Sequence, residues 1–143
     1  MEWTKANFLL TTDNQKIDVN QVYDLLKDTY WAKDRPKYIV EETVKNSLCF
    51  GIVKEQELVG FARVITDKVA FTWLLDVIIK DTYRGEGLGK WLMQCIMEHP
   101  DIIHTSIGLA TKDAHGLYEQ YGFKVEDMMI RRRKKYPEKN SIV

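Results

Sequence analysis

Residues 77–92 read Val-Ile-Ile-Lys-Asp-Thr-Tyr-Arg-Gly-Glu-Gly-Leu-Gly-Lys-Trp-Leu, and they carry the strongest structural signal in the chain. An apolar run rich in β-branched residues is followed by glycines at alternating positions and then by apolar residues at helical spacing. The pattern predicts a strand, a tight loop and a helix. Glycines let backbone N–H groups approach a ligand, and a helix start adds unpaired N–H groups and a positive dipole end. The stretch therefore predicts an anion site, most naturally for a phosphate or diphosphate.

The spacing of the glycines narrows the choice of phosphate ligand. A P-loop needs a glycine where this chain has Arg84, and a serine or threonine where it has Trp91. The dinucleotide fingerprint needs a glycine where this chain has Lys90, and its loop follows the first strand of a fold. Both a nucleoside triphosphatase and a dinucleotide-binding site are therefore disfavoured.

Two segments of the chain resemble one family. Residues 76–89 keep an Asp, an Ile, Tyr-Arg-Gly and two further glycines, and they resemble the acetyl-CoA-binding motif of the GNAT superfamily of N-acetyltransferases. Residues 114–123 read Ala-His-Gly-Leu-Tyr-Glu-Gln-Tyr-Gly-Phe and are similar to a second motif of that family. The first motif alone would also suit an ordinary helix cap and turn. Two motifs in the family's order are more specific.

The composition is that of an ordinary soluble globular protein. The 143 residues suit one domain, 1–143, with 45% hydrophobic and 29% charged residues. Because 21 basic residues balance 21 acidic ones, no overall charge favours nucleic acid or a membrane as a partner. There is no apolar run long enough to span a bilayer, and the start of the chain does not resemble a signal peptide, so we expect a cytoplasmic protein.

Apolar periodicity predicts the order of the elements. Helices are expected from the Asp18 cap to about residue 29, at 38–45, after the glycine loop up to His99-Pro100, and at 112–120. Strands are expected at 7–12, 48–53, 58–65, 69–79 and 102–110, and a closing hairpin at 123–125 and 128–133. The fold class is α+β (mixed α/β). The GNAT resemblance implies a single domain with a central, mostly antiparallel, twisted sheet and helices on both faces.

Neither the cysteines nor the charged tail suggests a separate function. Cys49 lies in a strand-like run and Cys95 at an apolar helix position, so both are expected to be buried thiols rather than a disulfide or metal pair. The basic run 131–135 is expected to be a solvated strand end. A nucleic-acid role is disfavoured, because no ladder of aromatic residues accompanies the run and the net charge is zero.

The resemblance implies an enzyme that transfers an acetyl group from acetyl-CoA to a primary amine, with no metal. The backbone of Val77 and Ile79 would pair with the pantetheine chain, and an N–H at Ile79 would polarise the thioester carbonyl. The diphosphate would lie on the loop, and other residues would line the coenzyme. The cofactor-binding residues expected on this basis are Val77, Ile79, Arg84, Gly85, Gly87, Leu88, Gly89, Lys90, Thr111 and His115. Thr111 departs from the family, since many members have an asparagine there.

Two residues are candidates for catalysis. Tyr118 matches the family tyrosine that protonates the departing thiolate, and a phenol with a pKa near 10 is available as a donor at neutral pH. Its alternative role is packing against Phe123. Asp76 is acidic within an apolar strand, so it is a candidate base for the amine. It could equally be a carboxylate that holds a loop by hydrogen bonds. Glu41, Glu42 and His115 are possible substitutes.

The acceptor is expected beside Tyr30 and Trp31, because in the resembled family the segment between the first two helices commonly lines the acceptor pocket. Aromatic side chains there could enclose an apolar or cationic amine, although core packing of Trp31 is an equal alternative. A small-molecule amine is the preferred acceptor, and the protein is expected to be a monomer or homodimer. The alternatives are a protein or peptide N-acetyltransferase, or a non-catalytic acyl-CoA-binding regulatory module.

Overall fold

The computed structural model describes residues 1–142, which form two compact units that divide after Gly108. The strands are β1 (Glu2–Lys5), β2 (Phe8–Thr11), β3 (Leu48–Lys54), β4 (Glu57–Thr66), β5 (Phe71–Ile79) and β6 (Ser106–Leu109). The helices are α1 (Val19–Leu26), α2 (Lys37–Lys45), α3 (Leu88–Glu98) and α4 (His115–Glu119). Short 3-10 turns are η1 (Asn14–Lys16), η2 (Asp81–Tyr83) and η3 (Lys139–Ser141). The expectation of one domain over residues 1–143 stays a prediction.

The strands form one sheet in sequence order, from β1 to β6. Each strand from β1 to β4 runs antiparallel to the next, and two-residue turns follow β1 and β3. The last strand runs parallel to β5, since the Ser106 N–H donates to the Ala70 carbonyl at 3.0 Å and Gly108 lies against Trp73. The predicted mostly antiparallel sheet is therefore confirmed.

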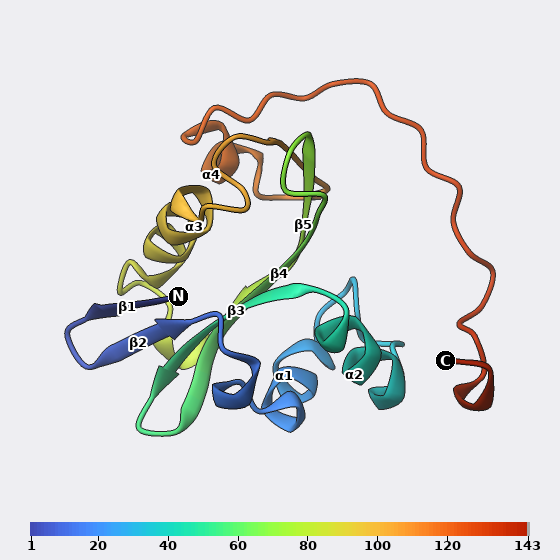
Figure 1. Cartoon of the computed structure of the whole chain (residues 1–143), viewed down its shortest axis with the longest axis horizontal. Coiled ribbons are helices and arrows are strands. Elements are labelled where there is room, and N and C mark those ends of the chain that lie inside the picture. The colour runs from blue at the N-terminus through green and yellow to red at the C-terminus, as the bar shows by residue number, and fades with distance from the viewer. Residues whose placement is uncertain (143) are drawn as a thin grey trace. The chain divides into compact units, whose positions relative to one another are not determined.

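Helices cover both faces of the sheet, as expected (Figure 1). On one face α1 packs against α2, β4 and β5, and Val22, Leu26 and Val40 of the two helices are buried in one cluster with Cys49 and Phe61 of the sheet. On the other face α3 packs against β3, β4 and β5. Neighbouring residues of a strand point to opposite faces, so this two-sided core needs the nearly continuous apolar runs seen in β3 and β4.

Local signals place the helix ends. The Asp18 carboxylate accepts a hydrogen bond from the Asn20 N–H at 2.9 Å and caps α1, as predicted. Pro36 stands at the N-cap of α2, and His99 ends α3 in an extended conformation. The residues predicted to point inward from α3 are all buried: Leu88, Trp91, Leu92, Cys95 and Ile96.

One predicted strand is shorter in the structure, and one strand of the structure was not predicted. The expected strand 102–110 is only Ser106–Leu109, because Ile102 to Thr105 form turns that close α3, with Ile102 N–H donating to the His99 carbonyl. Conversely, the short polar strand β1 was missed, because its exposed residues carry little apolar alternation and owe their strand geometry to pairing with β2.

The predicted closing hairpin at 123–125 and 128–133 is wrong. Residues 123–133 contain no strand, and Figure 1 draws the chain beyond α4 without arrows. Apart from the end of β6, residues 109–142 hold no strand that could supply backbone partners. Val125 and Met129 are 79% and 98% exposed, and the basic run 131–135 is exposed but is not a strand end.

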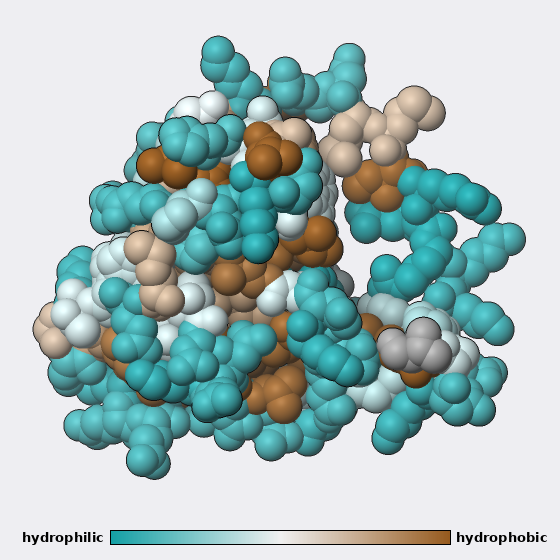
Figure 2. All heavy atoms as spheres, viewed as in Figure 1, coloured by the Kyte–Doolittle hydropathy of each residue, from teal (hydrophilic) through white to brown (hydrophobic). Residues whose placement is uncertain are grey.

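Most of the surface seen in Figure 2 is hydrophilic, with apolar side chains in small groups. Among residues 1–142 no helix is long and apolar enough to cross a membrane.

Candidate active site

The glycine loop opens α3 directly after β5. Gly85 and Gly87 have φ values of +85° and +78°, in the left-handed region that costs glycine little and other residues more. Gly87 is the N-cap of α3 and offers no side chain to the first turn, so the N–H groups of Leu88 and Gly89 are available to an external acceptor. The structure therefore has the exposed turn and helix start that residues 77–92 predicted.

The end of β5 adjoins this helix start. A Cβ built on Gly89 would lie 3.9 Å from Ile79 Cγ1. The N–H of Lys80 donates to the Val59 carbonyl of β4 at 2.7 Å. Because successive amides of a strand point to opposite edges, the Ile79 amide points away from β4. On that side lies β6, which is four residues long and begins with Ser106 beside Ala70. It therefore runs beside only the first half of β5.

Side chains brace the start of the loop. Glu57 of β4 accepts hydrogen bonds from Lys80 and, at 3.1 Å, from the Tyr83 hydroxyl. These bonds lower the pKa of the Glu57 carboxyl below its usual value. Arg84 is exposed and pairs with Asp81 at 3.1 Å, and its N–H donates to the Asp81 carbonyl at 3.2 Å. The amide of Arg84 is thus already engaged, and its guanidinium forms an exposed ion pair with Asp81 that a phosphate could replace.

Asp76 lies in a β-bulge between β4 and β5. Phe61 is opposite Ile78 and Arg63 is opposite Leu75, so two residues of β5 face one of β4. Asp76 has a φ of +54°, a left-handed conformation that Asp tolerates better than most residues do. The bulge turns its side chain into the face covered by α1 and α2, where Asp76 is 6% exposed.

Three side chains bind the Asp76 carboxylate. Arg35 donates from both terminal nitrogens at 2.8 and 3.2 Å, Arg63 Nε donates at 2.6 Å, and Trp31 Nε1 donates at 3.1 Å. Burial would raise the pKa of Asp76, but the two guanidiniums outweigh burial and hold its pKa below the usual value. Such a carboxylate is a poor proton acceptor near neutral pH, so these contacts favour the holding role over the base role.

The aromatic pair expected at the acceptor lies beside this cluster. Trp31 is 41% exposed and Tyr30 is 52% exposed, and their rings meet edge to face with centroids 5.0 Å apart. Trp31 is therefore not a core residue. The same segment is anchored by Ala32, which belongs to the hydrophobic core. Asp76 thus joins the segment before α2 to the half of β5 that leads into the glycine loop.

The remaining predicted residues lie in the second unit. Tyr118 is half-buried on α4, and its ring meets Phe123 edge to face with centroids 5.8 Å apart. Thr111 Oγ1 accepts a hydrogen bond from the Ala114 N–H at 3.0 Å just before α4. His115 is exposed as the first residue of that helix. The ring packing expected of Tyr118 is present, and its hydroxyl role stays a prediction.

The substitute bases lie on α2. Glu41 is exposed, and Glu42 accepts a hydrogen bond from Asn46 Nδ2 at 3.2 Å. Both residues therefore lie on a solvated helix face, which was the alternative to their role as substitute bases.

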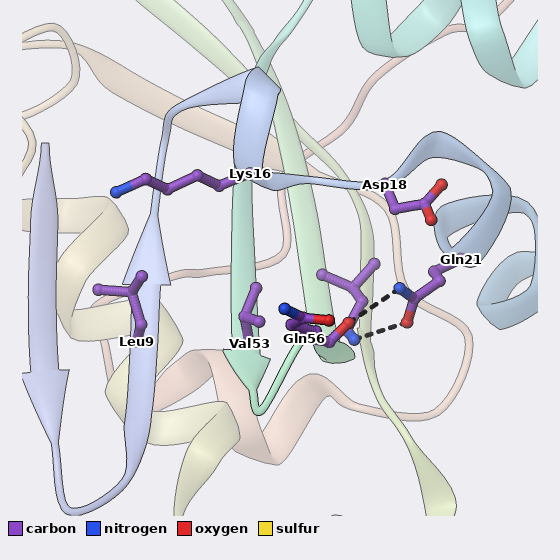
Figure 3. A pocket seen from close by; sticks show the side chains of 7 residues that line it. Leu9, Lys16, Asp18, Gln21, Val53 and Gln56 are labelled. Atoms are coloured by element: carbon purple, nitrogen blue, oxygen red, sulfur yellow. Dashed lines mark hydrogen bonds between the residues drawn. The ribbon is translucent and has the colours of Figure 1, made fainter.

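A surface hollow of about 450 Å³ lies elsewhere, and none of the predicted site residues lines it. It is lined by Leu9, Lys16, Asp18, Gln21, Val53, Gln56 and Leu58 (Figure 3). There Gln21 donates to the Gln56 carbonyl and accepts from the Leu58 N–H, which fixes the turn between β3 and β4.

Sequence reasoning missed the two arginines that bind Asp76. A signal for Arg63 was present, because a cation within the apolar run 58–65 and an anion within the next strand can satisfy each other across a hairpin. For Arg35 there was no such signal, since it lies 41 positions before Asp76 in an irregular segment.

Comparison with known proteins places these features in a family. Residues 45–125 match the acetyltransferase (GNAT) domain model. The crystal structure of a GNAT-family protein from Xanthomonas campestris pv. campestris is 39% identical, with a TM-score of 0.84 over 91% of this chain and 96% of that chain.

Two curated relatives are also similar. The protein FG08082 of Gibberella zeae, which is named as an acetyltransferase, is 30% identical over 67% of this chain and 66% of its own length. A ycf52-like protein of Prochlorococcus marinus, named as an uncharacterized N-acetyltransferase, is 35% identical over 57% of this chain and 47% of its own length. The chain thus spans slightly less than two thirds of the length of the first relative and about half of the length of the second. The family model covers more than half of the chain, including the glycine loop and α4, and this chain belongs to the GNAT acetyltransferase family.

Proposed function

We propose that this protein is an acetyl-CoA-dependent N-acetyltransferase that acts on the primary amine of a small molecule. The observation that carries the proposal is the loop with Gly85 and Gly87 in left-handed conformations, directly after β5 and at the start of α3, in a GNAT-family chain. Cytoplasmic residence, a monomeric or homodimeric state and the absence of a metal stay predictions from the sequence.

The chain offers two adjoining sets of backbone donors for the coenzyme. The N–H groups of Leu88 and Gly89 suit the diphosphate, because they combine unpaired donors with the positive end of the α3 dipole. The half of β5 beyond the reach of β6 suits the pantetheine chain, with the Ile79 amide pointing to the open side. The loop has room for this approach, since a Cβ at Gly85 would meet no atom within 4 Å.

Acetyl-CoA would supply a thioester whose carbonyl carbon is attacked by the amine. In this scheme the Ile79 N–H donates to the carbonyl oxygen as negative charge develops there. The Tyr118 hydroxyl gives its proton to the departing sulfur, whose free thiol has a pKa of about 8.5. A free alkyl amine has a pKa near 10.4, so about one molecule in a thousand is neutral at pH 7.4. The ammonium loses one proton to solvent water before the attack. After the C–N bond forms and the C–S bond breaks, the nitrogen loses a second proton, which returns through water to the Tyr118 oxygen.

Asp76 has a positioning role in this proposal. Its carboxylate already accepts four hydrogen bonds, and the two guanidiniums keep it ionised. Its hydrogen bond from Trp31 Nε1 holds the Trp31 ring in place, so that the Tyr30–Trp31 pair presents aromatic edges and faces to the acceptor. Aromatic faces attract cations and apolar groups, which suits a small ammonium compound.

The test is a thiol-release assay with acetyl-CoA and a panel of amines, polyamines, amino acids, aminoglycosides and lysine-containing peptides. We expect thiol release with at least one small amine and none without an amine. Release only with peptides would replace the small-molecule proposal by a protein acetyltransferase. If the protein binds the coenzyme but releases no thiol with any acceptor, it would instead be a non-catalytic acyl-CoA-binding module. Calorimetry with CoA separates these outcomes from a protein that does not bind the coenzyme at all.

A further inference from the structure

The β1–β2 hairpin brings Lys5 to the glycine loop. Lys5 ends β1 and pairs with Phe8, so only Ala6 and Asn7 form the turn, and Ala6 has a φ of +51°. A two-residue turn fixes the position of the strand ends that it joins. A Cβ built on Gly87 would lie 3.9 Å from Lys5 Nζ. Figure 1 shows β1 beside the chain that leads into α3.

The ammonium of Lys5 is available at this place. Among the residues that the structure describes, no ion pair joins Lys5 to a carboxylate, whereas Lys80 pairs with Glu57 and Arg84 with Asp81. The positive charge of Lys5 also acts on Cys95 of α3. Burial raises the pKa of the Cys95 thiol to about 11, and the nearby Lys5 ammonium partly offsets that rise. Lys5 is exposed, so its flexible side chain can adjust to an anion on the loop.

We propose that Lys5 is a coenzyme-binding residue whose ammonium contacts the diphosphate of CoA held by the glycine loop. The inference rests on the proposed function and adds a contact from outside the residues 45–125 that define the family match. The donors at the start of α3 and the Lys5 ammonium are close enough to share one diphosphate. A lysine contributes a point charge with three donors, which suits a phosphate group without demanding one geometry.

Lys5→Met removes the charge and keeps a long unbranched side chain. Lys5→Arg keeps the charge. The matched control is Lys45→Met, because Lys45 is an exposed lysine at the end of α2, on the other face of the sheet. Calorimetry at low salt measures the Kd of CoA and of 3′-dephospho-CoA for all four proteins, and thermal unfolding checks that each variant is folded.

We expect Lys5→Met to raise the Kd of CoA about three- to tenfold, as for one partly exposed charged contact. Lys5→Arg should restore most of the affinity, and Lys45→Met should leave it unchanged. The penalty of Lys5→Met should be the same for 3′-dephospho-CoA, because that ligand keeps the diphosphate.

Two results would overturn the proposal while leaving the proposed function intact. One is equal CoA affinity for the wild type and Lys5→Met. The other is a penalty that disappears with 3′-dephospho-CoA, which would move the contact to the 3′-phosphate. If the wild type binds neither ligand, the proposed function fails as well.

Discussion

Arg35 and Asp76 form a two-point ion pair, in which the terminal nitrogens of Arg35 lie 2.8 and 3.2 Å from the two carboxylate oxygens. Arg63 Nε completes the cluster at 2.6 Å. The side chains of Arg35, Arg63 and Asp76 are 10%, 8% and 2% exposed, so solvent screens these contacts little. The pair joins the irregular segment before α2 to the bulge in β5, and it therefore fixes the acceptor side of the proposed site.

Replacing Asp76 should destabilise the protein strongly. Asp76→Asn keeps the shape and tolerates the positive φ, but it leaves two guanidiniums without their anion, and we expect a loss of about 3 kcal/mol in the free energy of unfolding. Asp24→Asn is the control, because the pair of Asp24 with Lys27 is exposed and should cost less than about 0.5 kcal/mol. Urea denaturation measures both. Similar small losses for the two variants would show that the Asp76 cluster contributes nothing specific.

The same cluster predicts acid sensitivity. The pKa of Asp76 is lower in the folded chain than in the unfolded chain. The stability that it contributes is therefore fully present above the unfolded pKa of about 3.9 and is lost as the pH falls through the lower folded pKa. Wild-type protein should lose more free energy of unfolding between about pH 5 and pH 2 than Asp76→Asn does. Parallel losses in the two proteins would contradict this assignment.

Gly87→Ala tests the glycine loop. Alanine at a φ of +78° should cost about 1 kcal/mol of stability and should place a methyl group where the coenzyme approaches. Gly122→Ala is the matched control, because Gly122 has a φ of +88° and open space around it but lies outside the loop. We expect both variants to lose similar stability and only Gly87→Ala to weaken CoA binding, by about tenfold or more. Equal CoA affinities in calorimetry would argue against a diphosphate on this loop.

Tyr118→Phe tests the proton donor. Phenylalanine preserves the edge-to-face contact with Phe123 and removes only the hydroxyl. If the hydroxyl protonates the departing thiolate, kcat should fall about a hundredfold while the KM for acetyl-CoA changes little. Tyr121→Phe serves as the control in the same segment and should keep normal kcat. A kcat unchanged by Tyr118→Phe would leave Tyr118 with packing alone.

Both thiols should be unreactive in the native protein. They are free and buried, as the sequence predicted, and burial raises the pKa of Cys49 to about 12 and that of Cys95 to about 11. A thiol reacts as its thiolate, so a disulfide reagent at pH 8 should modify Cys95 slowly and Cys49 more slowly still. Both should react at once in urea, and Cys→Ser variants assign the phases. One thiol that reacts rapidly in the native protein would contradict the burial of these side chains.

Local sequence patterns were enough to predict the strand, glycine loop and helix at residues 77–92, the cap of α1, the inward face of α3 and the burial of both cysteines. These features depend on neighbours in the chain: hydrophobic periodicity, a capping carboxylate and glycines that accept positive φ. The resemblance to one family came from the same local motifs.

Which distant side chains meet depends on the folded arrangement of the chain. Arg35 reaches Asp76, and Lys5 reaches Gly87, across long stretches of chain, because sheet order and hairpin turns set these distances. The failed hairpin at 123–133 has the same physical reason. Alternation of apolar residues shows that a segment can form a strand, but a strand also needs a neighbour whose backbone groups are free to pair with it.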